Sequence, residues 1–312
     1  MGTDKELDSL KLQLVKEFLL NKNKLSSYIV QGFPTPKRTL FERQIHTDLR
    51  GLPVNKMWKV LIALRFYATG CYQLVNGDMF ELGQSTISRI VKDVSLRIAN
   101  NLRAWVNFPL PNQVEIVQKK FYQISKFPGV TMAMDCTHIP ISSPGGEQAE
   151  YFRNRKGWMS LNVQLIVGPD MEIFDVVTRW PGSVHDSRIF QNSRALELME
   201  NGLVKGICIA DGGYAQTQFV YTPHPNPITN AQKKYNYSHI RTRNVVERVN
   251  GVLKSRFRCL SRKLGTAIKT SKMHLDEEEL QFQYETVDAE VMNDGGNNGF
   301  NIRNSFIARH FM

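Results

Sequence analysis

The stretch Gly129-Val-Thr-Met-Ala-Met-Asp135 is a short apolar run that ends in an acid. Two longer runs with strand character follow, residues 158–167 and 171–180, and Gly168-Pro169-Asp170 between them favours a hairpin turn. A fourth run, residues 206–211, again ends in an acid, Asp211. Helical spacing over residues 185–200 separates the third of these runs from the fourth. A second helical run, residues 240–257, follows the fourth. The pattern predicts an α/β domain built on a mixed sheet.

Residues 1–122 carry helical periodicity instead, most clearly over 57–68, 72–80 and 84–100. The last of these runs has an apolar face and an opposite face that carries Arg89 and Lys92. A short helix, a turn at Leu82-Gly83 and a second helix with a basic face predict a helix-turn-helix-like segment at about 57–100. A plain helical bundle with a solvated face gives the same pattern, so both interpretations stay open.

The composition indicates a polyanionic partner. Forty Lys and Arg residues against 29 Asp and Glu leave a net charge of +11, which favours nucleic acid first and an anionic membrane surface second. Hydrophobic residues make up 42% of the chain, enough for a core, so wholesale disorder is excluded. No apolar run approaches the roughly 20 residues of a membrane span, and no signal peptide is evident. Four scattered cysteines argue against a zinc cluster or a disulfide framework. We therefore expect a soluble, basic, intracellular protein, with nucleic acid as the first expected partner and no membrane partner.

Charge is distributed unevenly along the chain. Residues 233–263 contain ten Lys or Arg and one acid, whereas residues 276–294 contain eight acids and no Lys or Arg. A Gly/Asn cluster follows at 295–299. The periodicity and this charge reversal together predict three parts: a helical region over 1–122, a domain of alternating β-rich and helical runs over 123–263, and an acidic, Gly/Asn-rich tail over 264–312.

Three acids stand where a nuclease site would need them. Asp135 and Asp211 each end a strand, and Glu247 lies on the polar face of the last long helix. An Asp on the first strand, an Asp on the fourth and a carboxylate on a later helix is the arrangement of an RNase H-like site. Phosphodiester cleavage there uses two divalent ions about 3.5–4 Å apart. Mg²⁺ or Mn²⁺ takes oxygen ligands, so we predict that these three acids bind metal and carry catalysis.

Basic residues near these acids are candidates for binding phosphates. Arg153, Arg155 and Lys156 form one group, which a solvated loop would also explain, and the overall charge favours phosphate contacts. The helix that carries Glu247 contributes three more. These are Arg243, Lys254 and Arg256.

Several segments together resemble the PIF/Harbinger superfamily of DDE transposases, in particular its transposase-derived nucleases. They are FPGVTMAMDCTHIPI (127–141), AEYFRNRKGWMSLNVQ (149–164), WPGSVHDSRIFQNS (180–193), ADGGY (210–214) and HIRTRNVVERVNGVLKSRFRCL (239–260). The resemblance implies an RNase H-like catalytic domain whose DDE acids are Asp135, Asp211 and Glu247. It also implies metal-dependent DNA cleavage, a nuclear and sometimes cytoplasmic location, and a Myb-like DNA-binding partner. A homo-oligomer is a further expectation.

Two points remain open within the resemblance. The family's His-Asp pair maps to His185 and Asp186, and Asp186 is predicted to be a further metal ligand; alternatively, Ser183 is a helix N-cap and Asp186 completes a variant capping box. The family also continues after Leu260 into an apolar helix, whereas here residues 265–275 lead into the acidic tail. We therefore expect that helix to be missing. Its loss would favour an alternative function, a domesticated DNA-binding or scaffold protein without nuclease activity.

Overall fold

The computed structural model describes residues 54–263 and 297–312. The chain divides into two compact units, residues 1–62 and 63–312, and each is described by itself. Of the first unit only residues 54–62 are described, and they include the start of helix α4, Lys56–Thr69. The sheet and every predicted site residue lie in the second unit.

The second unit begins with the helices predicted to resemble a helix-turn-helix. Helix α5 spans Gln73–Phe80 and helix α6 spans Gln84–Asn100, and a 3₁₀ turn, η1, follows at Leu102–Ala104. Glu81 ends α5 in the left-handed conformation with φ 54°, and Gly83 is the N-cap of α6. The apolar face of α6 is buried, whereas Arg89 and Lys92 are exposed. The order helix, short turn, helix therefore agrees with the sequence prediction.

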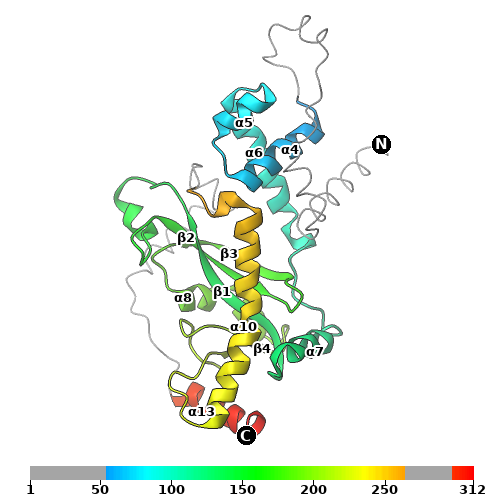
Figure 1. Cartoon of the computed structure of the whole chain (residues 1–312), viewed down its shortest axis with the longest axis vertical. Coiled ribbons are helices and arrows are strands. Elements are labelled where there is room, and N and C mark those ends of the chain that lie inside the picture. The colour runs from blue at the N-terminus through cyan, green and yellow to red at the C-terminus, as the bar shows by residue number, and fades with distance from the viewer. Residues whose placement is uncertain (1–53, 264–296) are drawn as a thin grey trace, which may run out of the picture. The chain divides into compact units, whose positions relative to one another are not determined.

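A five-stranded mixed sheet forms the centre of this unit (Figure 1). Its order is β3-β2-β1-β4-β5; the pairs β3-β2 and β2-β1 are antiparallel, and β1-β4 and β4-β5 are parallel. The strands span Val130–Pro140 (β1), Ser160–Val167 (β2), Ile173–Pro181 (β3), Ile207–Ile209 (β4) and Val220–Tyr221 (β5). The predicted α/β class with a mixed sheet is confirmed. Strand β5 was not predicted, because two residues give no periodic signal.

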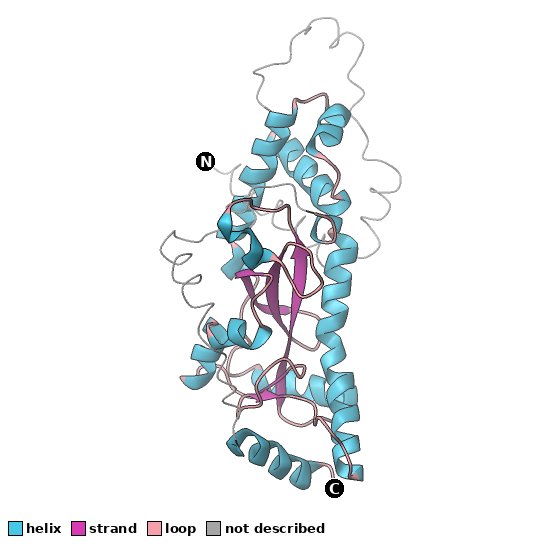
Figure 2. Ribbon diagram, turned by 90° about the vertical axis from the view of Figure 1, so that its left-hand side faces the viewer, coloured by secondary structure: helices cyan, strands magenta, loops and turns pink. Residues whose placement is uncertain are grey.

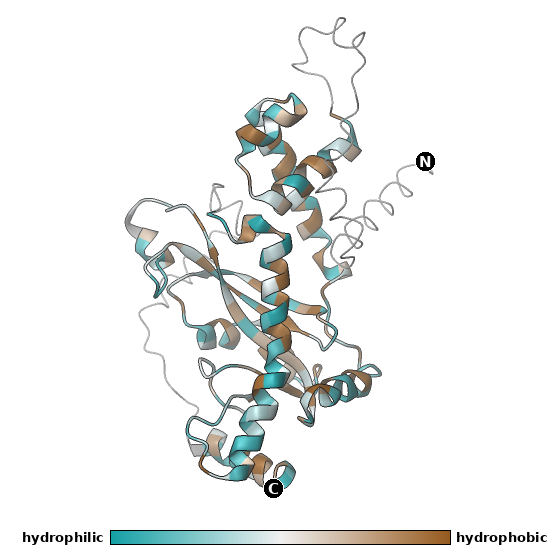
Figure 3. Cartoon of the chain, in the orientation of Figure 1, coloured by the Kyte–Doolittle hydropathy of each residue, from teal (hydrophilic) through white to brown (hydrophobic). Residues whose placement is uncertain are grey.

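Side chains alternate between the two faces of the sheet and so form two cores. Ala133 and Ile139 of β1 pack with α7, Val114–Ser125, and α10, Asn230–Arg256. Met132 and Met134 pack on the other face with α8, Asp186–Gln191, and α9, Arg194–Glu200. Figure 2 shows α10 running along one side of the sheet. Figure 3 shows hydrophobic and hydrophilic residues alternating along α10. The period of two in the strands thus determines which face each strand residue occupies.

Helix α10 has 27 residues and begins at Asn230, ten residues before the predicted start. Its first turn is closed by a capping box in which Thr229 and Gln232 each accept from the other's backbone N–H. That pair, two residues after Pro227, is a start signal that the apolar spacing alone did not reveal. Two short 3₁₀ segments complete this part of the chain, η2 at Glu147–Phe152 and η3 at Arg258–Leu260.

The core extends beyond the predicted limits of the sheet domain at both ends. Val117 and Phe121 of α7, which lie before residue 123, belong to the core under α10. Residues 264–296 lie outside the described part, so the expectation of a missing helix there stays untested. The prediction of a solvated tail is corrected for the last residues, because helix α13, Asn297–His310, packs on the core through Ile307, and Phe311 after it does the same.

No helix among the described residues is long and apolar enough to span a bilayer.

Candidate active site

Strand pairing brings Asp135 and Asp211 to the same level of the sheet. In the parallel pair β1-β4, Ala133 lies opposite Ile209. Asp135 follows two residues later within β1, and Asp211 follows two residues later in the turn after β4. Asp211 Oδ1 accepts the backbone N–H of Gly213 at 2.9 Å, which holds its carboxylate in the turn after β4. The two predicted acids therefore lie at the same level of the sheet, Asp211 just after the end of β4 and Asp135 in the middle of β1. Strand β1 continues to Pro140, whereas the sequence predicts that it ends at Asp135.

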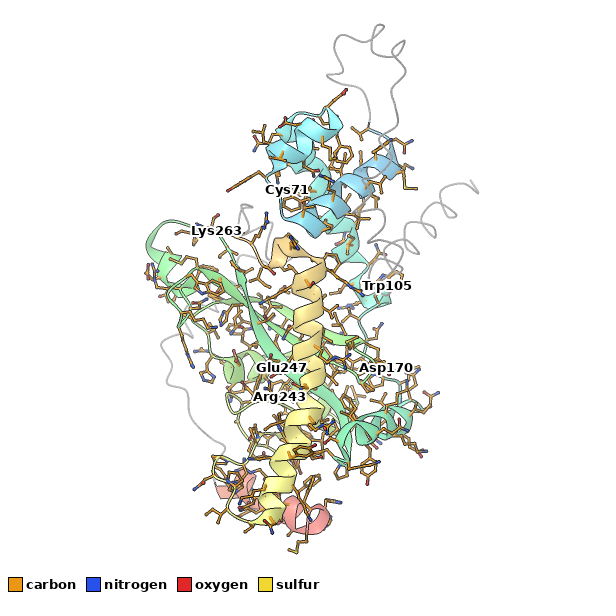
Figure 4. The ribbon with its side chains drawn as sticks, in the orientation of Figure 1. Cys71, Trp105, Asp170, Arg243, Glu247 and Lys263 are labelled. Atoms are coloured by element: carbon orange, nitrogen blue, oxygen red, sulfur yellow. The ribbon has the colours of Figure 1, made fainter. Side chains whose placement is uncertain are left out.

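Helix α10 presents three polar residues to this edge at positions i, i+4 and i+7: Arg243, Glu247 and Asn250. Asn250 Nδ2 donates to Asp135 Oδ2 at 3.1 Å, and Arg243 Nη1 lies 3.8 Å from Asp135 Oδ1. Arg243 also donates to Glu247 Oε1. Figure 4 shows Arg243 and Glu247 as neighbours on α10. One face of α10 thus contacts Asp135 through Arg243 and Asn250, and the same face carries Glu247.

The pKa of Asp135 shows that the four acids share one electrostatic environment. This pKa is raised to about 6, chiefly by burial, and the guanidinium of Arg243 opposes part of the rise. The charges of Asp211, Asp186 and Glu247 also contribute to the rise, in that order. Several carboxylates crowded around a partly buried one are costly without a cation, which is a mark of functional sites.

Asp186 begins helix α8 but does not form the capping box considered above. The N-cap is His185, whose ring Nδ1 accepts the backbone N–H of Ser187, and Ser183 is exposed. Asp186 Oδ1 instead accepts from Asn162 Nδ2 at 2.8 Å. Gly213 lies close to both Asp211 and Asp186: a Cβ there would be 3.0 Å from Asp211 Oδ1 and 3.7 Å from Asp186 Oδ2. The capping-box alternative with Ser183 is therefore wrong.

The residues at this edge fit a hard divalent cation. Four carboxylates offer oxygen ligands, and the amide oxygens of Asn162 and Asn250 are buried without a hydrogen-bond partner. Among the described residues, no three His, Cys, Asp or Glu side chains are grouped closely enough to hold a metal ion in their present positions. The contacts explain this, because Arg243 engages Glu247 and Asn162 engages Asp186. The chemistry of the donor set fits, and binding would require these side chains to rearrange.

Residues 134–276, which include all four acids, match the family model described as DDE superfamily endonuclease. The protein named "Putative nuclease HARBI1" from Mus musculus is 32% identical over 218 residues, covering 69% of this chain and 62% of the mouse protein. The resemblance to Harbinger-type DDE transposase-derived nucleases is confirmed.

More distant relatives of this Harbinger-type chain come from plants and bacteria. "Protein ALP1-like" of Arabidopsis thaliana is 27% identical over 240 residues, covering 69% of this chain and 56% of the plant protein. "Probable transposase for insertion sequence element IS702" of Microchaete diplosiphon is 28% identical over 183 residues, covering 55% of this chain and 60% of the transposase. The chain spans less than two thirds of the length of these three relatives.

The predicted phosphate-binding residues of this Harbinger-type domain lie in several places. Arg153 is exposed and paired with Glu150, while Arg155 and Lys156 are exposed in the turn after it. Lys254 Nζ donates to the carbonyl of His138 at 3.0 Å, which places it beside β1. Three more are distributed over two helices: Arg89 and Lys92 are exposed on α6, and Arg256 is half-buried at the end of α10. Arg243, also predicted to bind phosphate, lies among the carboxylates instead.

Two amides complete the site and were not predicted as site residues. Asn250 lies seven residues after Arg243, and that spacing was the available signal. Asn162 lies in Ser-Leu-Asn-Val-Gln-Leu-Ile-Val, where polar residues alternate with apolar ones before the apolar end of the strand, and a polar residue in a strand with this apolar content was the available signal. Cys136, next to Asp135, has its pKa raised by burial and contacts Tyr214 OH at 3.2 Å, which argues against a nucleophilic thiolate.

Proposed function

We propose that this chain is a transposase-derived endonuclease that hydrolyses phosphodiester bonds in DNA with divalent metal ions. The observation that supports it is the convergence of Asp135, Asp211 and Glu247 from β1, the end of β4 and α10, inside the segment that matches the DDE endonuclease family. Bound Mg²⁺ or Mn²⁺ would stabilise negative charge on the attacking and leaving oxygens. Asp135 and Asp211 would hold the ions from the sheet, and Glu247 would reach them from the helix.

The surrounding residues position the DNA and the acids. Asn162 holds Asp186 at the start of α8, beside the turn that carries Asp211, so Asp186 can serve as a further metal ligand. Lys254, Arg155 and Lys156 supply positive charge for the phosphodiester backbone next to β1. A nuclear, and also cytoplasmic, location, a Myb-like partner protein and assembly as a homo-oligomer belong to this proposal through the Harbinger resemblance.

One observation supports the alternative, a DNA-binding or scaffold protein that no longer turns over. Glu247 is paired with Arg243, and its side chain is 46% exposed, whereas that of Asp135 is 19% exposed. A third acid engaged by an arginine is not in position to bind metal unless that pair opens. The two functions therefore differ in whether the carboxylates bind metal.

Plasmid cleavage tests the proposal. Purified protein is incubated with supercoiled plasmid and Mg²⁺, Mn²⁺ or a chelator. We expect metal-dependent nicking or linearisation, and a loss of roughly 10³-fold or more in Asp135→Ala, Asp211→Ala and Glu247→Ala, because each removes a metal ligand. The triple variant should lose little more than one single variant, since residues that act as a unit are not additive.

The control is Glu200→Ala, which removes an exposed acid at the end of α9 that is not one of the proposed metal ligands. It should cleave as the wild type does. All variants should shift a DNA fragment in a gel as the wild type does. Robust cleavage by folded Glu247→Ala would contradict the assignment, and DNA binding without any cleavage in the wild type would favour the alternative function.

A further inference from the structure

Arg243 contacts two of the proposed metal ligands at once. Its Nη1 lies 3.8 Å from Asp135 Oδ1, and its Nη2 donates to Glu247 Oε1. Its side chain is only 19% exposed, so its charge is held among the acids and not in solvent. Arg243 therefore joins an acid of the sheet to an acid of the helix.

The other oxygen of Asp135 is also engaged from α10. Asn250 Nδ2 donates to Asp135 Oδ2 at 3.1 Å. Each carboxylate oxygen of Asp135 thus has a donor on the helix, one neutral and one charged. An amide can turn and offer its oxygen to a cation, whereas a guanidinium has donors only and cannot become a ligand. Of the two contacts, only that of Arg243 is incompatible with a metal ion bound between Asp135 and Glu247.

We propose that Arg243 is a positioning residue that acts as an internal counter-cation, occupying the place between Asp135 and Glu247 and exchanging with a divalent ion when the site loads. This inference rests on the proposed metal-dependent function. Arg243 reduces the repulsion between the acids before loading and competes with the metal for the same oxygens. Once released, its planar guanidinium is suited to a phosphate oxygen, which would couple loading to DNA binding.

The competition predicts a gain in metal affinity when Arg243 is replaced. A cation that takes the oxygens held by Arg243 must first displace a charge-assisted hydrogen bond, which costs it roughly tenfold or more in affinity. Arg243→Gln should therefore bind Mn²⁺ about tenfold more tightly than the wild type in isothermal titration calorimetry at fixed pH. The same variant should melt at a lower temperature without metal, because its acids lose their counter-charge, and the difference should shrink with saturating Mn²⁺.

Arg248→Gln is the matched control. It removes the same charge from the same helix, five residues further on, at an exposed position. It should bind Mn²⁺ with wild-type affinity, which separates local competition from a general change in net charge. Arg243→Lys keeps the charge near the acids and should retain the wild-type affinity or a value close to it. This second variant keeps the comparison available if Arg243→Gln folds poorly.

The outcomes separate this inference from the proposed function. Tighter binding in Arg243→Gln alone supports the exchange. If the wild type binds Mn²⁺ and cleaves plasmid, but Arg243→Gln binds no more tightly than Arg248→Gln, the exchange is wrong while the nuclease function stands. If Arg243→Gln folds poorly, Arg243→Lys decides, and Mn²⁺ affinity well above that of the wild type would overturn the exchange. If the wild type and all three variants fail to bind Mn²⁺, the exchange and the proposed metal-dependent function are both wrong.

Discussion

Asn162 lies in strand β2, all of whose residues are buried, and its side-chain nitrogen donates to two acceptors at the start of α8. These acceptors are Asp186 Oδ1 at 2.8 Å and the carbonyl of Val184 at 2.9 Å. One buried amide therefore determines both the path of the chain into α8 and the direction of the Asp186 carboxylate. A buried amide is costly unless its polar atoms are used, and here its nitrogen is used twice.

Replacing Asp186 by asparagine tests whether this acid binds metal. Asp186→Asn keeps the shape of the side chain and an oxygen that can accept from Asn162, but it is a much poorer ligand for a hard cation. Without metal we expect a melting temperature within a few degrees of the wild type. At a Mn²⁺ concentration 100 times the dissociation constant, the wild type should gain about 2.7 kcal/mol, and Asp186→Asn should lose most of that gain.

Differential scanning calorimetry with and without Mn²⁺ measures both effects, and Glu200→Gln provides the control for loss of one acid. Equal Mn²⁺ stabilisation of Asp186→Asn and the wild type would restrict Asp186 to holding the start of α8.

The acids of the site could be predicted from the sequence because their positions follow from chain order. Asp135 and Asp211 each follow a short apolar run, and the parallel pairing of β1 with β4 places the ends of these two runs side by side, although β1 itself continues to Pro140. Arg243 could not be placed the same way. It shares a helix face with Glu247, and spacing alone does not show whether an arginine extends towards solvent or towards a buried carboxylate. The contact depends on the depth of Asp135 under α10, which is a property of packing.

At the scale of elements, the short connection between α5 and α6 gives this part of the chain the helix-turn-helix-like order that the sequence predicts. The turn is short because Glu81 takes the left-handed conformation and the backbone N–H of Leu82 returns to the carbonyl of Gly77. Gly77 is buried, and a Cβ there would lie 2.4 Å from the Leu82 carbonyl oxygen, so any larger residue would open the turn. The exposed face of α6 then carries Arg89 and Lys92. This geometry leaves the basic face available, and a solvated bundle face would look the same.

Two arginine variants distinguish these interpretations. If α6 reads a major groove, Arg89→Ala should lower the discrimination between preferred and random duplexes by about 1–3 kcal/mol. Arg155→Ala, in the exposed turn near β2, should instead weaken binding to all DNA sequences equally. It should also reduce the slope of the logarithm of the binding constant against the logarithm of the salt concentration by about 0.9, for one lost phosphate contact. Enrichment from a random duplex pool and binding titrations at several salt concentrations measure the two quantities. The same uniform loss in both variants would make α6 an ordinary helix with a solvated face.

Across the whole molecule, the largest difference from the sequence prediction is at the C-terminus. The sequence predicts an acidic, Gly/Asn-rich tail here, yet Gly299 lies inside α13, where a Cβ would come within 2.3 Å of the Gln216 carbonyl oxygen. Arg303 is buried and donates to Thr222 Oγ1 at 3.3 Å and to the Pro223 carbonyl at 3.1 Å. Glycine here permits close packing, although in a sequence it indicates a turn. The apolar spacing of this segment was the opposing signal, in Ile302, Phe306, Ile307 and Phe311.

Phe311 provides a test of whether this last segment belongs to the domain. Its ring is 8% exposed and lies 5.5 Å from the rings of both Phe127 and Tyr235, measured between centroids. Because Phe127 and Tyr235 are fully buried beside the sheet, removing the Phe311 ring should leave a cavity in the main core. We expect Phe311→Ala to lower the free energy of unfolding by about 3 kcal/mol in urea titrations.

The neighbouring residue Met312 is 88% exposed, so Met312→Ala should change that free energy by less than about 0.5 kcal/mol. If both variants unfolded at the same urea concentration as the wild type, α13 would contribute nothing to the core. If only Phe311→Ala is destabilised, the residues at 297–312 are part of the catalytic domain, and the core that supports Asp135 extends to the C-terminal helix. Mn²⁺ affinity of folded Phe311→Ala should then equal that of the wild type, because Phe311 contacts the core and not the acids.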